Sequence, residues 1–250
     1  MDRTLLKGLH VLEALVRLGP ETRLTDIAAA CDLDKSNAHR VLLTLRHAGY
    51  AQLSPATRRY SATLKLSDLG MRVREQFTFG EAAHAVLETL AEATGETAQL
   101  VVLDRHAAVV VDACVSSEWV SFVPQAHSSL PVHRHAFGLV LLAFLAPQMR
   151  EAELDLLGGE AGSPDLLAQL ARIGRDGYLA EASDPGDTYF SIAAPVRSAG
   201  GSVIAAIGIS GPRWRWNDDL TEMRIAAVLR GAADVARSVG EVPAAPFVIG

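Results

Sequence analysis

The chain lacks the features that mark secreted, membrane-spanning or metal-clustered proteins. Its 250 residues include only two cysteines, Cys31 and Cys114, too few for a disulfide framework or a four-thiolate zinc site. The longest apolar runs, such as residues 139–145, are too short to cross a bilayer. The amino terminus has no apolar run behind a basic start, so no secretory signal is evident. We therefore expect a reduced, cytoplasmic protein without a membrane segment.

Motifs of catalysis are also missing. No Gly-rich phosphate loop, HExxH or CxxC occurs. Residues 208–212 resemble a nucleophile elbow, but they end in proline where that motif has glycine, and they are predicted to form a strand that enters a turn. His133 and His135 would share one face of a strand, and imidazole suits zinc or nickel, yet no third ligand is apparent. We therefore expect no catalytic residue, no cofactor and no bound metal.

What the sequence does contain is an ordinary globular composition with an uneven distribution of charge. Hydrophobic residues make up 49% and charged residues 21%, which excludes intrinsically disordered and fibrous classes. Residues 1–65 hold ten Lys/Arg against six Asp/Glu, a net charge of +4. Residues 66–250 hold thirteen against twenty-three, a net charge of −10. The basic part can meet a polyanion that the acidic part would repel.

The basic part begins with a predicted amphipathic helix. Apolar residues at i, i+4, i+7 and i+11 mark one face of this helix, namely Leu5, Leu9, Leu12 and Val16. Gly19 and Pro20 end it.

Two further helices follow, with the spacing of a helix-turn-helix. Thr25 is placed to cap a short second helix and Asp34 to cap a third. The third helix has an inward stripe formed by Ala38, Val41, Leu42 and Leu45. Its outward face is rich in hydrogen-bond donors, which come from Lys35, Ser36, Asn37, His39 and Arg40. In a helix-turn-helix this face enters the major groove, so we expect these residues, together with Thr25, to contact DNA.

A cationic hairpin comes directly after the third helix. Residues 50–53 and 60–62 are strand-like, and the turn between them carries Arg58 and Arg59. Cations beside a recognition helix can lie on the phosphate backbone or in the minor groove, as in the wing of a winged helix. Two alternatives remain open: a plain three-helix bundle with a solvated polar face, and a head that binds a protein instead of DNA.

The acidic part alternates strand hairpins with helices, which predicts an α+β domain with an antiparallel sheet. Strand-like segments lie at 99–103, 109–113, 192–196 and 203–209. Helices are predicted at 64–79, 81–94, 136–145, 148–157, 165–176 and 219–239. The tail at 241–250 contains two prolines, and we expect it to be loosely ordered.

Blocks of residues spread over nearly the whole chain carry a resemblance to a known family. They are residues 24–28, 34–42, 49–50, 69–70, 94–97, 130–133, 177–178, 193–196 and 209–212. In order and spacing these blocks resemble the IclR-type bacterial transcriptional regulators. The resemblance implies a winged helix-turn-helix DNA-binding domain at 1–66, a linker helix at 67–80, a GAF-like effector-binding domain at 81–240 and a tail at 241–250. It also implies a homodimer or homotetramer that switches its binding to double-stranded operator DNA when a small-molecule effector binds.

The resemblance assigns an effector pocket position by position. The residues implied are Trp119, Phe122, Ala136, Phe137, Gly138, Glu181, Tyr189, Phe190, Ser191, Gly208 and Ser210. Three positions depart from the family pattern: Leu139 stands for a lysine, Phe190 for an arginine and Gly208 for the first of two strand serines. Aromatic faces stack against aromatic ligands, and the backbone amides that begin the helix at Ala136 can hold a carboxylate or carbonyl oxygen.

These observations predict a ligand-responsive DNA-binding regulator that represses a catabolic operon and senses a small aromatic acid, amide or related acyl compound. One alternative is an activator of the same family that senses a short oxoacid, in which case Phe137, Phe190 and Leu139 belong to the core. Another is an enzyme built on the GAF-like domain, which needs a paired nucleophile and base that the sequence does not provide.

Overall fold

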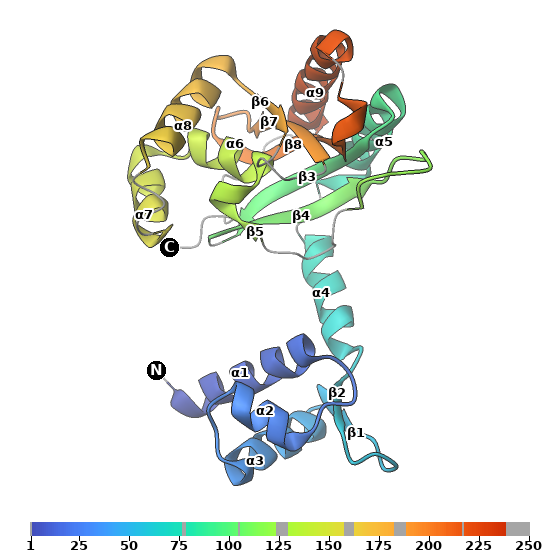
Figure 1. The fold of residues 1–250 in the computed structure, drawn as a ribbon, viewed down its shortest axis with the longest axis vertical. Coiled ribbons are helices and arrows are strands. Elements are labelled where there is room, and N and C mark those ends of the chain that lie inside the picture. The colour runs from blue at the N-terminus through green and yellow to red at the C-terminus, as the bar shows by residue number, and fades with distance from the viewer. Residues whose placement is uncertain are drawn as a thin grey trace. The chain divides into compact units, whose positions relative to one another are not determined.

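The computed structural model describes residues 2–76, 79–104, 106–123, 130–157, 163–182, 189–216 and 218–238. The chain forms two compact units, Met1–Phe77 and Thr78–Gly250, and each is described by itself (Figure 1). Within those described ranges, no helix is both long and apolar enough to span a membrane. The predicted tail at 241–250 lies outside the described residues.

The first unit has a three-helix core followed by a hairpin and a fourth helix. Its elements are α1 (Arg3–Leu18), α2 (Leu24–Ala30), α3 (Lys35–His47), β1 (Ala51–Leu53), β2 (Tyr60–Ala62) and α4 (Lys65–Gln76). Leu15 of α1 packs with Ile27 of α2 and Leu42 of α3, and all three are fully buried. β1 and β2 pair antiparallel, so the predicted wing hairpin is confirmed.

The apolar stripe predicted on α1 lies on the outer surface of this unit. The helix buries a different face, to which Leu15 belongs. By contrast, Leu5, Leu9 and Val16 are 62%, 45% and 54% exposed, and Leu12, the fourth member of the stripe, is half-buried. The helix ends as predicted at Gly19, whose φ of 86° lies in the left-handed region that favours glycine. α1 is therefore apolar on two faces, and the first unit covers only one of them.

The described part of the second unit is built on a six-stranded antiparallel sheet with the order β5-β4-β3-β8-β7-β6. The strands are β3 (Thr97–Asp104), β4 (Ala107–Cys114), β5 (Leu130–Pro131), β6 (Leu179–Ala182), β7 (Tyr189–Arg197) and β8 (Val203–Pro212). The two predicted hairpins, β3–β4 and β7–β8, are confirmed. β3 pairs with β8 and so joins the hairpins into one sheet.

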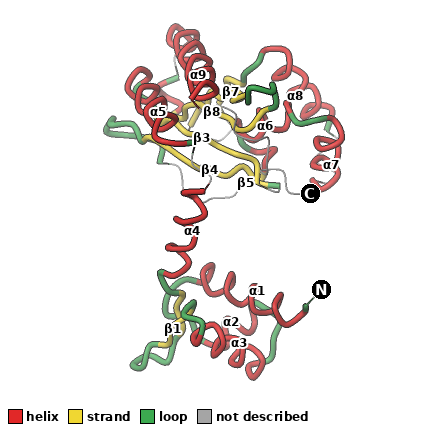
Figure 2. The backbone as a smooth tube through the Cα atoms, turned by 180° about the vertical axis from the view of Figure 1, so that it is seen from behind, coloured by secondary structure: helices red, strands yellow, loops and turns green. Residues whose placement is uncertain are grey.

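Helices cover both faces of the sheet. The helices are α5 (Gly80–Thr94), α6 (Ala136–Phe144), α7 (Pro147–Leu157), α8 (Pro164–Asp176) and α9 (Asp218–Ser238). α5 and α9 lie side by side over one face, which carries Leu100 and Ile207 (Figure 2). α6 covers the other face, which carries Val101 and Ala206. Successive strand residues point to opposite faces, so each strand contributes to two separate cores.

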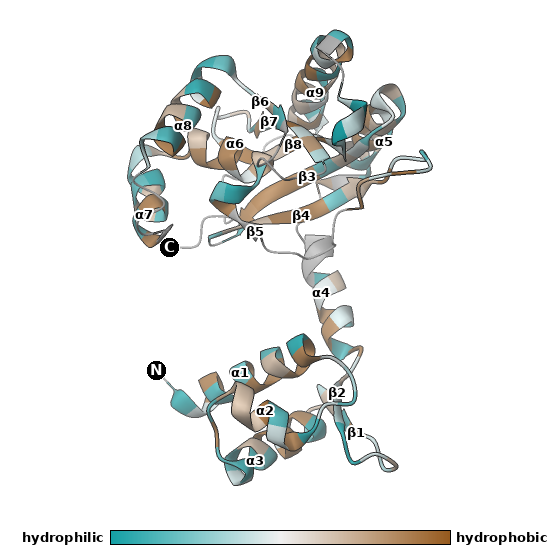
Figure 3. Ribbon diagram, viewed as in Figure 1, coloured by the Kyte–Doolittle hydropathy of each residue, from teal (hydrophilic) through white to brown (hydrophobic). Residues whose placement is uncertain are grey.

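α6 confirms the buried helix that the sequence predicts at 136–145. Eight of its nine residues are buried, and its apolar character is visible in Figure 3.

The turn before α6 corrects one prediction. His133 belongs to a 3-10 turn, Val132–Arg134, and His135 occupies the N-cap of α6. The two imidazoles therefore do not share the face of a strand. The short strands β5 and β6 were not predicted, because two to four residues carry too little periodicity to be recognised.

Candidate functional site

The outer face of α3 presents a row of donor side chains. α3 begins at Lys35 because Asp34 caps it: Asp34 Oδ1 accepts a hydrogen bond from the Asn37 backbone N–H at 2.8 Å. This hydrogen bond holds the pKa of Asp34 below its usual range. Asn37 Nδ2 also donates to Asp34 Oδ2 at 2.5 Å. The predicted DNA-contacting residues of this helix are all exposed, namely Lys35, Ser36, Asn37, His39 and Arg40.

The prediction that Thr25 caps the second helix is wrong. α2 begins one residue earlier, at Leu24, and Arg23 occupies the N-cap without a side-chain hydrogen bond to the helix. The hydroxyl of Thr25 instead donates to Asp26 Oδ1 at 3.1 Å. Thr25 is nevertheless exposed, so its predicted contact with DNA does not depend on the cap.

The two arginines of the wing differ in their surroundings. Arg58 is exposed, with a φ of 57° in the turn between β1 and β2. Arg59 is half-buried, and its Nη1 donates to the backbone oxygen of Glu21 at 3.2 Å. Thr57 donates to the Glu21 carboxylate at 2.5 Å. Arg59 therefore holds the wing to the segment after α1, whereas Arg58 presents its charge outward.

In the second unit, a buried polar patch lies on the sheet face that α6 covers. Ser191 of β7 and Ser210 of β8 stand directly opposite each other, with their hydroxyl oxygens 2.8 Å apart. Gln99 of β3 donates from Nε2 to Ser210 Oγ at 3.0 Å. None of the three is more than 1% exposed. This serine patch (Gln99, Ser191 and Ser210) is a preformed hydrogen-bonding surface within an apolar layer.

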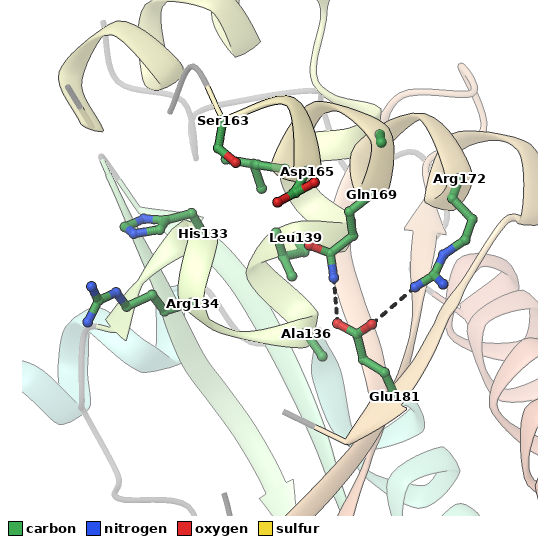
Figure 4. A pocket seen from close by; sticks show the side chains of 11 residues that line it. His133, Arg134, Ala136, Leu139, Ser163, Asp165, Gln169, Arg172 and Glu181 are labelled. Atoms are coloured by element: carbon green, nitrogen blue, oxygen red, sulfur yellow. Dashed lines mark hydrogen bonds and ion pairs between the residues drawn. The ribbon is translucent and has the colours of Figure 1, made fainter. Parts of the chain in front are cut away.

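A cavity of about 730 Å³ opens between α6, α8 and β6 (Figure 4). It is lined by His133, Arg134, Ala136, Leu139, Ser163, Asp165, Leu166, Ala168, Gln169, Arg172 and Glu181. Glu181 stands opposite Ser191 in the register of β6 and β7, so both side chains lie on the same face of the sheet. The cavity and the serine patch therefore lie over the same sheet face, although none of the three patch residues lines the cavity.

Two residues of α8 hold Glu181 in place. Gln169 Nε2 donates to one carboxylate oxygen at 2.6 Å, and Arg172 Nη2 donates to the other at 3.0 Å (Figure 4). Sequence reasoning identified Glu181 but missed Gln169 and Arg172. Their i, i+3 spacing places them on one helix face. The sequence has no signal that this face returns over β6, because that depends on tertiary packing.

The start of α6 forms another part of the cavity wall. Ala136 lines the cavity, and the N-cap residue His135 makes no side-chain hydrogen bond to the helix. Burial lowers the pKa of His135 to about 4, so its imidazole is neutral at pH 7 and stacks on Phe137 at 5.2 Å between ring centroids. Gly138 is required here, because an added Cβ would lie 2.1 Å from the Val132 carbonyl oxygen. The first amides of the helix remain a suitable partner for an anionic or carbonyl oxygen.

Aromatic rings lie close to the serine patch. The rings of Phe122 and Tyr189 are 5.0 Å apart. Tyr189 is two residues from Ser191 on β7 and so points to the same sheet face. Trp119 corrects the expectation that it lines a pocket: its side chain is fully exposed, so it contributes to no wall in the described structure.

Phe190 also corrects the predicted pocket. It lies between Tyr189 and Ser191 and therefore points to the opposite face, beneath α9. There its ring meets Trp216 at 4.8 Å and the Arg224 guanidinium at 5.1 Å. It belongs to the core of that face and cannot share a cavity with Ser191.

Two other predicted residues serve packing. Phe137 is fully buried in the core beneath α6. Gly208 lies on β8, where an added Cβ would be 1.9 Å from the backbone oxygen of Ile192. A serine would not fit at this position without moving β7.

The polar groups of the second unit are suited to binding and not to catalysis. Ser210 contacts an amide and another hydroxyl, and neither can accept its proton as a general base does. In the described ranges, no group of three or more His, Cys, Asp or Glu is arranged to hold a metal ion. A helix-turn-helix with an exposed donor face, and an α+β unit with a polar-lined cavity, together define a ligand-binding transcriptional regulator.

Comparison with known proteins places the chain in a particular family. The model of the IclR helix-turn-helix domain matches residues 4–55, and that of the bacterial transcriptional regulator IclR C-terminal domain matches residues 72–237. The chain belongs to the IclR family of bacterial transcriptional regulators. It is a DNA-binding regulator and not an enzyme.

Individual relatives cover most of the chain. It is 29% identical to the HTH-type transcriptional regulator XynR of Escherichia coli, over 82% of this chain and 84% of the relative. It is 25% identical to the transcriptional repressor IclR of Escherichia coli, over 95% and 90%. A crystal structure of an IclR homologue from Microbacterium hydrocarbonoxydans, complexed with 4-hydroxybenzoate, aligns with a TM-score of 0.76 at 25% identity, over 94% and 98% of the two chains.

Proposed function

We propose that this regulator is a cytoplasmic repressor of a catabolic operon whose binding to operator DNA responds to a small aromatic acid, amide or related acyl compound. The observation that carries the proposal is the cavity of about 730 Å³ between α6, α8 and β6, a volume typical of small-molecule sites. Its walls offer both kinds of contact that such a compound needs. Ala136, Leu139 and Leu166 are apolar, while Gln169, Arg172 and the α6 amides are polar.

Two relatives support the finer points of the proposal. The homologue that binds 4-hydroxybenzoate has the same fold over nearly the whole chain, which supports an aromatic effector. The relative named as a repressor supports repression. Of the aromatic residues predicted for the pocket, Phe122 and Tyr189 support an aromatic effector, since Phe190 and Phe137 are packed in the core.

A thermal-shift screen of the purified protein tests the effector class. Ligands that bind only the folded state raise the unfolding midpoint. We expect benzoate, 4-hydroxybenzoate, benzamide and benzhydrazide to raise it and pyruvate and glyoxylate to leave it unchanged. The reverse pattern would replace the aromatic effector by a short oxoacid. A reporter gene under the chain's own operator then separates repression from activation.

The DNA-binding surface is proposed to be α3 with the wing. Arg40 is exposed on α3 in line with Ser36, and a bidentate contact to guanine is available to it. Replacing Arg40 with alanine is expected to weaken specific operator binding by about 1–3 kcal/mol. Arg17, exposed in the last turn of α1, is a matched control that keeps operator affinity when replaced by alanine. A steep loss of wild-type affinity with salt is expected, since phosphate contacts release counterions; a flat dependence would favour a protein partner.

The homodimer is proposed to form through the exposed stripe of α1. Leu5, Leu9 and Val16 form an apolar row on a helix whose other face already packs in the core. A self-complementary helix face suits a second copy of the same chain, because a two-fold interface brings the same patch from both subunits together. Such a dimer places two α3 helices for the two halves of a symmetric operator.

A further inference from the structure

Beyond the cavity, the second unit contains a buried cluster of three charged residues. Glu96, at the junction of α5 and β3, is 1% exposed, and its carboxylate accepts hydrogen bonds from Arg215 and Arg224, each at 2.9 Å. Arg224 of α9 also donates to the backbone oxygen of Arg215 at 3.1 Å. Burial raises the pKa of Glu96, and the two guanidiniums oppose that shift. Gly211 leaves room for this carboxylate, because an added Cβ would lie 2.0 Å from Glu96 Oε2.

Stability alone does not account for such a cluster. Removing charges from water is costly, and a buried ion pair often contributes no more than apolar residues of the same volume would. A buried cluster of ion pairs can instead hold the chain in one particular arrangement.

Arg215 extends from the cluster to the segment Val115–Val123, which we call the wall loop. Arg215 Nη2, the atom that contacts Glu96, also donates to the backbone oxygen of Val120 at 2.7 Å. Arg215 Nη1 lies 3.8 Å from the Glu118 carboxylate. The side chain of Arg215 is only 15% exposed, whereas its partners Val120 and Glu118 lie at the surface.

The residue after Glu96, Thr97 at the start of β3, also holds this loop. Thr97 Oγ1 donates to the backbone oxygen of Phe122 at 2.7 Å and accepts from the backbone N–H of Ser116 at 3.1 Å. Thr97 thus contacts the loop directly, whereas Glu96 acts on it through Arg215. The wall loop is thus attached at Ser116, at Val120 and at Phe122.

The wall loop carries the ring that contacts Tyr189. The ring of Phe122 lies 5.0 Å from that of Tyr189 at a tilt of 45°, while Trp119, Val120 and Val123 are largely exposed. A segment without helix or strand, and with this much exposed apolar surface, has few contacts of its own to offset the entropy cost of being ordered. Its position therefore depends on the side chains that reach it from the body of the domain.

We propose that Arg215 is a positioning residue for the effector site. It touches no ligand; it holds the wall loop on the sheet so that Phe122 is already in place when an aromatic effector arrives. Glu96 orients the Arg215 guanidinium, and Arg224 supports Glu96 from α9. Pre-ordering a wall lowers the entropy cost of binding. This inference rests on the proposed aromatic effector only for its last step, the effect on affinity.

The first test needs no ligand. Amide hydrogen exchange of the wall loop is compared in the wild-type chain, Arg215→Met and Arg224→Met. Each substitution leaves Glu96 paired with one remaining arginine, but only Arg215→Met removes the bond to Val120. We expect the wall-loop amides to exchange at least tenfold faster in Arg215→Met and at the wild-type rate in Arg224→Met. Equal exchange in the two variants, whether fast or slow, would overturn the proposal. Arg213→Met, in the 3-10 turn Arg213–Arg215, controls for loss of a surface charge.

The second test is a double-mutant cycle with 4-hydroxybenzoate as the probe, read by calorimetry. If Arg215 acts by placing Phe122, Arg215→Met should raise the dissociation constant about tenfold in the wild-type background. In the Phe122→Ala background the same change should be less than twofold. Additive effects would mean that Arg215 does not act through Phe122. If the wild-type chain binds no aromatic probe, the proposed effector class fails, while the exchange experiment still decides the role of Arg215.

Discussion

The hydroxyl oxygens of Ser191 and Ser210 lie 2.8 Å apart, and Ser210 additionally accepts a hydrogen bond from Gln99 at 3.0 Å. Ser210 is therefore the centre of the serine patch, and Ser191 stands at its edge. All of these groups are buried, so a missing partner cannot be replaced by bulk water.

This asymmetry predicts different costs for two similar substitutions. Ser210→Ala leaves both the Gln99 amide and the Ser191 hydroxyl without their partner and should lower the free energy of unfolding by about 2–3 kcal/mol. Ser191→Ala keeps the Gln99–Ser210 bond and should cost about 1 kcal/mol. Urea denaturation of both variants measures the difference. Equal costs would mean that Gln99 finds another partner in the folded chain.

Two glycines in helices predict opposite effects of alanine. At Gly138 of α6 a Cβ would lie 2.1 Å from a backbone oxygen, so the helix must shift, and Gly138→Ala should destabilise by about 3 kcal/mol or more. At Gly174 of α8 nothing lies within 4 Å of such a Cβ, so Gly174→Ala should stabilise by about 0.5–1 kcal/mol. Thermal unfolding of the pair gives the comparison. A neutral Gly138→Ala would contradict the close approach of the 3-10 turn to α6.

His135 predicts a dependence of stability on pH. Its pKa is lowered by burial from 6.5 to about 4 in the folded chain, so the unfolded chain binds more protons between these values. Stability should therefore be complete above pH 7 and fall as the pH drops, by about 2 kcal/mol between pH 7 and pH 5. His135→Phe, which keeps an aromatic ring beside Phe137, should remove this part of the pH dependence. Urea titrations of wild type and variant at the two pH values provide the test, and identical slopes against pH would count against it.

The exposed stripe on α1 predicts a change of assembly without a change of fold. Leu9→Glu places a charge on an exposed position, so the thermal midpoint of the isolated unit should stay nearly the same, while self-association of the chain should be lost. Sedimentation velocity reads the assembly state. Lys7→Glu, exposed on the same helix outside the stripe, controls for the added negative charge. An unchanged sedimentation coefficient in Leu9→Glu would remove α1 from the proposed interface.

Much of this architecture is visible in the sequence because it follows from local patterns. Asp34 caps its helix, Gly19 ends another, and the alternating apolar runs of β3, β4, β7 and β8 form the predicted hairpins. Each depends on residues only a few positions apart. The family blocks added the order of the domains, but of the effector residues they imply only Ala136 and Glu181 line the cavity.

The sequence alone determined which segments form helices and hairpins, and which family the chain resembles. Only the tertiary structure decided which side of each element is covered. The α1 stripe has the spacing of a buried face, yet it is exposed because another face of the same helix packs in the core. Phe190 is adjacent to Ser191, but the alternation of β7 turns it to the opposite core. Gln169 and Arg172 reach Glu181, and Arg215 reaches Glu96 and Val120, only because segments up to 119 residues apart pack together. No local pattern encodes such contacts, since they depend on how whole elements pack.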